Sequence, residues 1–132
     1  MSNKVAKFFD RLFTAKDAAK SLHWNYDCDT PGCWVAIHKL TDEVEASLAE
    51  HIDALGEAFL SEGGRQLPAG SSGDPAVVTD VEGVVDALKP LLTSAEDLLN
   101  DGATSTALRN ALEDFVQDLQ VKIWLLSGGK PK

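Results

Sequence analysis

The sequence contains no long hydrophobic run. Its apolar stretches fall well short of the ~20 residues that a membrane-spanning helix needs. The chain opens with MSNKVAKFFDRLF, in which charged residues interrupt what would be the apolar centre of a secretory signal. We therefore expect a cytoplasmic protein with neither a membrane span nor a signal peptide.

Basic residues are scarce, with 12 Lys and Arg against 21 Asp and Glu and a net charge of −9 at pH 7. Proteins that bind nucleic acid usually present a concentrated basic face. The best that this sequence offers is Lys4 with Lys7 near one end and Lys130 with Lys132 at the other. DNA binding is therefore not expected, and compaction of DNA without metal chemistry conflicts with this charge. An acidic surface keeps a protein soluble and also attracts cations.

Cysteine occurs only twice, as Cys28 and Cys33 in the segment CDTPGC. Disulfides belong mainly to secreted proteins, and no secretory signal is evident. We therefore expect two thiols here rather than a disulfide.

Long runs of β-branched residues are absent too, and Ala, Leu and Val dominate the apolar positions, which favours helices. Hydrophobic residues make up 44% of the 132 residues, enough for the core of one domain spanning 1–132. Apolar residues recur at helical spacing in four segments. The predicted helices cover residues 3–25, 32–62, 79–100 and a segment that follows Gly102 and ends near Leu126. Pro90 should kink or restart the third helix because it lacks a backbone donor.

The connection between the second and third predicted helices, residues 63–78, reads GGRQLPAGSSGDPAVV and is rich in Gly. This composition is typical of an exposed connection that crosses the molecule. Two long helices joined by such a crossover to two more helices predict an all-α, ferritin-like four-helix bundle.

Imidazole and carboxylate side chains recur at helical spacing on the second predicted helix. His38 and Asp42 are four residues apart, as are Asp53 and Glu57, so each pair projects side by side. At ~100° per residue, Asp42 and Asp53 point within ~20° of each other, which places both pairs on one stripe. Imidazole and carboxylate together form a ligand set for iron, manganese or zinc.

The two pairs are too far apart to share one metal within a single helix. The separation of His38 and Asp53 is 15 residues, or ~22 Å at the rise of a straight α-helix. If two copies pack antiparallel about a two-fold axis, the histidine pair of one faces the carboxylate pair of the other. The spacing therefore predicts a homo-oligomer, at least a dimer, with a shared site. His23 can reach the same site because the connecting loop brings it near the second helix.

These residues belong to a longer recognisable pattern. The run LHWNY at 22–26 is followed by IHKLTDEV at 37–44, then by Asp53, Glu57 and the pair Gly63-Gly64. Their order and spacing resemble the Dps family, the mini-ferritins named as DNA-binding proteins from starved cells. The run KIWLL at 122–126 is similar to that family's closing helix.

The resemblance implies a ferroxidase and iron-storage protein that protects against oxidative damage. Its reaction is the oxidation of Fe(II) with hydrogen peroxide or dioxygen at a dinuclear site between two subunits. The implied ligands are His23, His38 and Asp42 from one subunit and Asp53 and Glu57 from its partner. Trp24 would lie beside the site without binding iron, and the shell would be dodecameric.

The sequence departs from the family pattern in three places. The loop between His23 and His38 is about three residues longer than usual and holds both cysteines. The family's short helix between the second and third main helices has no counterpart in residues 63–78. No Lys-rich tail is present, so DNA binding is not carried over, and the missing helix leaves the shell size open.

Two alternatives use other residues. His23, Cys28, Cys33 and His38 follow one another at equal spacing and would suit a structural zinc site in a non-enzymatic helical oligomer. Ferritin chemistry within one subunit needs Glu-x-x-His motifs, but Lys20, Val35 and Leu48 stand three residues before the histidines. We expect His51 at the surface and Trp34 and Trp124 in the core.

Overall fold

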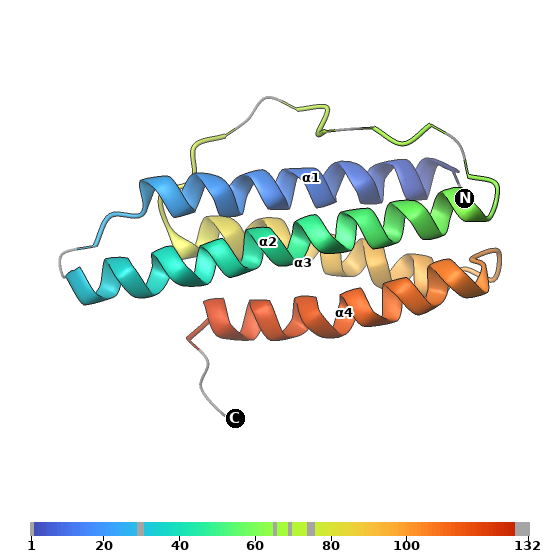
Figure 1. The fold of residues 1–132 in the computed structure, drawn as a ribbon. Helices are drawn as coiled ribbons and strands as arrows, with labels where there is room; N and C mark the ends of the chain where they lie inside the picture. Colours follow the sequence, from blue (N-terminus) through green and yellow to red (C-terminus); the bar gives the residue numbers. More distant parts are fainter. Residues whose placement is uncertain (1, 29–30, 65, 69, 74–75, 129–132) are drawn as a thin grey trace.

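The computed structural model describes residues 2–28, 31–64, 66–68, 70–73 and 76–128, which contain four α-helices and no strand (Figure 1). The helices are α1 (Ser2–Asn25), α2 (Pro31–Ser61), α3 (Val81–Leu99) and α4 (Thr106–Leu126). Each packs on two neighbours: α1 lies against α2 and α3, and α4 lies against the same two helices. The predicted all-α four-helix bundle is confirmed. In the described part of the chain, no helix has the length and apolar character needed to span a bilayer.

The helix ends follow from local sequence signals. The Asp80 side chain accepts a hydrogen bond of 2.8 Å from the Gly83 N–H and caps the start of α3. At the end of α2, Gly63 has a φ of +92° and the Gly64 N–H donates to the Phe59 carbonyl at 3.1 Å. This is a Schellman ending, which needs a residue without a side chain at the left-handed position. A Cβ at Gly64 would lie 2.4 Å from the Phe59 ring, so both glycines are required there.

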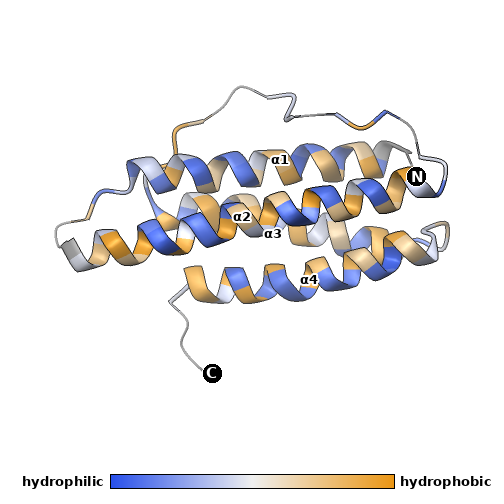
Figure 2. Cartoon of the chain, viewed as in Figure 1, coloured by the Kyte–Doolittle hydropathy of each residue, from blue (hydrophilic) through white to orange (hydrophobic). Residues whose placement is uncertain are grey.

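The core is one continuous cluster of buried side chains from all four helices. Phe8 is fully buried and packs edge-to-face on Phe9 and Phe115, with ring centroids 5.6 and 5.7 Å apart. Hydrophobic and hydrophilic residues alternate along every helix (Figure 2), as expected when one stripe of each helix faces the core.

The crossover between α2 and α3 runs back along α1 over the length of the bundle (Figure 1). The Ser72 N–H donates to Asp10 Oδ1 at 2.6 Å, and the Val78 N–H donates to Ser21 Oγ at 2.8 Å. The crossover brings the chain back to the end of the bundle at which α2 begins, so α2 and α3 run parallel. These two helices lie diagonally opposite each other in the bundle. The predicted long crossover is confirmed.

Pro90 does not divide the third helix. α3 is continuous from Val81 to Leu99, and Pro90 lies on its exposed face. Proline leaves the carbonyl of Asp86 without its usual helical donor, and at an exposed position water can bond that carbonyl instead. Of the two predicted outcomes, a kink or a fresh turn, the fresh turn does not occur, because α3 is unbroken through Pro90.

Candidate functional site

His23 and His38 face each other across the α1–α2 turn. His23 lies in the last turn of α1, and His38 lies two turns into α2. Their rings are stacked, with centroids 3.8 Å apart and planes 23° apart. His23 Nδ1 lies 2.9 Å from the His38 carbonyl oxygen, and His38 Nδ1 lies 3.2 Å from the His23 carbonyl oxygen. Each ring is therefore held by the backbone of the other helix.

These reciprocal contacts fix the tautomer of both rings. A carbonyl oxygen only accepts hydrogen bonds, so Nδ1 of His23 and of His38 must carry a proton. A neutral ring then keeps the lone pair on Nε2. Metal-binding histidines commonly show this arrangement, with one ring nitrogen bonded to a carbonyl and the other free to bind. When the rings are neutral, these contacts leave both Nε2 atoms able to bind a metal ion.

Two side chains support the histidine pair. Thr41 is fully buried, and its hydroxyl lies 3.3 Å from His23 Nδ1 while donating to the Ile37 carbonyl at 2.8 Å. The Trp34 ring stacks on the other face of the pair, 4.4 Å from the His38 ring and 19° from its plane. The result is a ladder of three rings, Trp34, His38 and His23.

The tryptophans differ from their predicted positions. Trp34 is 40% exposed and Trp124 is 46% exposed, so the expectation that both lie in the core is wrong. Trp34 packs along α2 against His38, one helical turn further on. Trp24 is 69% exposed, and the Lys20 ammonium lies 5.2 Å from the centre of its ring. The ring next to the histidines is therefore that of Trp34.

The carboxylates Asp42, Asp53 and Glu57 are all exposed on α2. Within the described residues, none of the hydrogen bonds or ion pairs uses them. Asp42 lies one turn beyond His38, so it can join the two histidines. Asp53 and Glu57 lie towards the other end of α2 and line a shallow hollow of about 210 Å³. Apolar side chains from α1, α2 and the crossover, among them Phe9, Ile52 and Leu67, form the rest of that hollow.

The described residues of a single chain do not close a metal site. Among the described residues, no three His, Cys, Asp or Glu side chains are grouped so that they could hold a metal ion. The structure brings His23 and His38 together, whereas Asp53 and Glu57 stay on the far half of the same helix.

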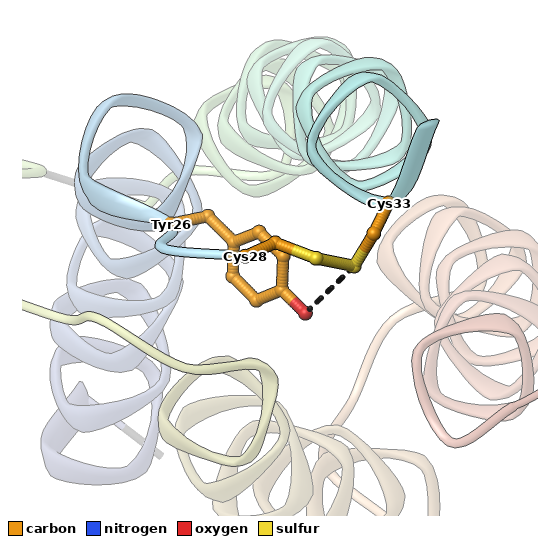
Figure 3. The surroundings of a disulfide bond; sticks show 3 residues. All are labelled: Tyr26, Cys28 and Cys33. Carbon is orange, nitrogen blue, oxygen red and sulfur yellow. Dashed lines mark hydrogen bonds between the residues drawn. A yellow bond between two sulfur atoms is a disulfide. The ribbon is translucent and has the colours of Figure 1, made fainter. Parts of the chain in front are cut away.

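The two cysteines form a disulfide, so the prediction of two free thiols is wrong. Cys28 follows α1 and Cys33 lies in the first turn of α2, with their Cα atoms 6.1 Å apart. This separation suits a disulfide. Figure 3 shows the Tyr26 ring directed towards the bond, and the Tyr26 hydroxyl donates to Cys33 Sγ at 3.6 Å.

The disulfide also bears on the zinc alternative. A sulfur atom that is bonded to another sulfur is not a thiolate, and zinc binds the thiolate. Cys33 and His38 are moreover five residues apart, so they point about 140° apart around α2. In this state the zinc site of His23, Cys28, Cys33 and His38 is not formed.

His51 is not a surface residue, contrary to expectation. Its side chain is 19% exposed, and its ring packs edge-on against Phe115 of α4, with centroids 5.1 Å apart. His51 Nε2 lies 2.8 Å from Asp118 Oδ2, which also accepts from Ser47; Lys122 Nζ lies 3.0 Å from Oδ1. Burial acts to raise the pKa of Asp118, but the hydrogen bonds from Ser47, Lys122 and His51 outweigh it and lower that pKa. This network joins α2 to α4.

Comparison with models of protein families found no match for this chain, and searches of characterised proteins and of solved structures found none either.

Two supporting residues, Thr41 and Trp34, were not predicted from the sequence. Trp34 stands four residues before His38, a spacing that brings side chains together on a helix and that points to the stack. Thr41 gave no such signal, because its hydroxyl reaches His23 only through the packing of α1 on α2.

Proposed function

We propose that the protein is a Dps-like ferroxidase and iron-storage subunit with a ferritin-like bundle. Its dinuclear site would form between two copies related by a two-fold axis. The observation that carries this proposal is the reciprocal bonding of His23 and His38, which leaves both Nε2 atoms ready to bind a metal. Metal-binding histidines commonly have this arrangement.

The proposed site combines two unlike halves. His23, His38 and Asp42 of one subunit would meet Asp53 and Glu57 of the partner subunit. Imidazole nitrogens bind Fe(II) well, while carboxylates favour the more highly charged Fe(III). A mixed set therefore holds the substrate and also favours its oxidation.

The proposed reaction oxidises two Fe(II) ions with one molecule of hydrogen peroxide. Each iron loses one electron, the O–O bond breaks, and two protons are taken up to give two Fe(III) and two water molecules. Because both electrons go to the same peroxide, no hydroxyl radical is released. Dioxygen is the alternative oxidant.

Charge and exposure support the delivery of iron. The chain carries a net charge of −9, and the three candidate carboxylates are exposed and free of ion pairs among the described residues. A negative surface raises the local concentration of cations and speeds their capture. Assembly beyond the dimer into a dodecameric shell stays a prediction, as does a cytoplasmic location.

The test is the rate of Fe(II) oxidation measured by stopped flow. Asp53→Ala/Glu57→Ala should abolish the fast phase, and so should His38→Ala. A matched control is Glu50→Ala, which removes an exposed carboxylate from the same helix and should leave the rate unchanged.

Mixing the two inactive variants tests the sharing of the site. When the two variants are unfolded and refolded together, mixed dimers form. Each mixed dimer has one site that lacks ligands from both subunits and one site with all its ligands intact. Activity should therefore return in the mixture although each variant alone is inactive. A mixture that stays inactive, while the wild-type protein recovers from the same treatment, would overturn the shared site.

A further inference from the structure

Two interactions connect the chain segments on either side of the turn between α1 and α2. One is the Cys28–Cys33 disulfide, and the other is the pair of hydrogen bonds between His23 and His38. Cys28 lies five residues after His23, and Cys33 lies five residues before His38, so both cysteines are nearer to the turn than the histidines are. The disulfide therefore closes the turn that joins the two chain segments that carry the histidines.

The disulfide is placed where a reductant can attack it. Both cysteines are partly exposed. Cys33 is the third residue of the long helix α2, and the positive end of a helix stabilises a thiolate. The Tyr26 hydroxyl, which already donates to Cys33 Sγ, adds a hydrogen bond to the same sulfur. These features stabilise Cys33 as a leaving group when the bond is broken.

We propose that Cys28 and Cys33 form a reducible couple that controls the order of the His23–His38 pair. The oxidised form holds the histidines ready to bind metal, and the reduced form loosens them. The part of this inference that concerns metal binding rests on the proposed function. The part that concerns the order of the turn does not.

The reductant is a dithiol, and the exchange balances. A thiolate of the dithiol attacks Cys28 Sγ, the S–S bond breaks, and Cys33 leaves as a thiolate that takes up a proton. The second thiol of the dithiol then attacks the mixed disulfide and releases Cys28. The protein gains two electrons and two protons, and the dithiol becomes a cyclic disulfide.

Reduction leaves the histidine pair dependent on weaker contacts. The two hydrogen bonds and the ring stack remain, but the covalent constraint on the turn is lost. The His23 and His38 rings then sample more orientations before they bind a metal. Loss of support around a metal-binding histidine commonly weakens metal binding by about tenfold or more.

The experiment compares oxidised protein with protein reduced by dithiothreitol and then freed of it under argon. Hydrogen exchange is measured for peptides covering the end of α1 and the first turns of α2, and Co(II) affinity is measured by titration. Reduction should speed exchange several-fold in these peptides and weaken Co(II) binding about tenfold. Peptides from the α3–α4 turn serve as the internal control and should not change.

The Cys28→Ser/Cys33→Ser variant separates the disulfide from the reductant. It should resemble the reduced protein, and dithiothreitol should have no effect on it. If exchange at the turn is the same in the oxidised, reduced and double-serine proteins, the switch is overturned, even where all three oxidise iron. If exchange speeds up as expected but no form binds Co(II), the switch of the turn stands and the proposed iron site is wrong.

Discussion

The two halves of α2 carry different kinds of site. The histidine end is fixed from within the chain, by the Trp34–His38–His23 stack, the hydrogen bonds to backbone carbonyls and the nearby disulfide. The carboxylate end has exposed side chains at Asp53 and Glu57 beside an apolar hollow. One end is therefore held in place by contacts within the chain, whereas the other end has exposed carboxylates with no hydrogen bond or ion pair among the described residues. The proposed shared site would form only where two subunits meet.

The largest expected effect comes from removing ligands at each end in turn. Both His38→Ala and Asp53→Ala/Glu57→Ala should lose the fast phase of Fe(II) oxidation. Only His38→Ala should also destabilise the chain, by about 1–2 kcal/mol, because it loses a ring stack and a hydrogen bond. The carboxylate variant should stay within about 0.5 kcal/mol of the wild type. Urea unfolding gives both values, and equal losses of stability would contradict the contrast between the two ends.

The disulfide should contribute to stability through the unfolded state. It closes a small ring of residues 28–33, for which the chain-entropy relation gives about 2 kcal/mol. Cys28→Ser/Cys33→Ser should therefore lower the free energy of unfolding by about that amount under oxidising conditions. In the presence of dithiothreitol the variant and the wild type should unfold alike. A difference that persists after reduction would mean that the serines, and not the lost bond, cause it.

Acid should weaken the contacts that Asp118 of α4 makes with the middle of α2. Its pKa is lowered in the folded protein, so its contribution to stability is full above the unfolded pKa of about 4 and is lost as the pH falls through the folded value. Because the group is partly exposed, the contribution should be below about 1 kcal/mol. Unfolding measured between about pH 7 and pH 2 should show a smaller loss of stability for Asp118→Asn than for the wild type. Identical pH profiles would show that the network adds nothing.

The smallest effect is expected at Trp24. This ring is 69% exposed, and its contact is with Lys20. Trp24→Phe should change the free energy of unfolding by less than about 0.5 kcal/mol, whereas Trp34→Ala should cost about 1 kcal/mol through the lost stack. Thermal unfolding of the two variants side by side makes the comparison. A larger loss at Trp24 would mean that it, and not Trp34, supports the histidines.

Sequence reasoning was most successful where one local pattern decides the outcome. The apolar spacing of the helices and the Gly63-Gly64 ending of α2 are local, and the first three helices agree with prediction within about two residues. α4 begins at Thr106 rather than directly after Gly102, because the chain first forms a turn closed by the Thr104 N–H on the Asp101 carbonyl. The approach of His23 to His38 was also predictable, since a short turn joins their helices.

Features that depend on packing or redox state were not predictable. The contact between His51 and Asp118 needs the rotation of α4 relative to α2, which no local pattern specifies. The disulfide depends on the distance between two helix ends and on the redox conditions, and the spacing of Cys28 and Cys33 alone does not decide it. The dimer and the iron site stay predictions, because both involve a second copy of the chain.

The diagonal arrangement of α2 and α3 has a consequence for how the chain folds. The α1–α2 and α3–α4 pairs are each local helical hairpins, which can form quickly, whereas α1 meets α3 and α2 meets α4 only after the crossover closes. Neither hairpin can bury its apolar stripe alone. Docking of the two hairpins should therefore be the slow, committing event, and the crossover sets its rate by keeping the halves close together. A break in that connection would turn folding into the association of two fragments, with a rate that depends on their concentration.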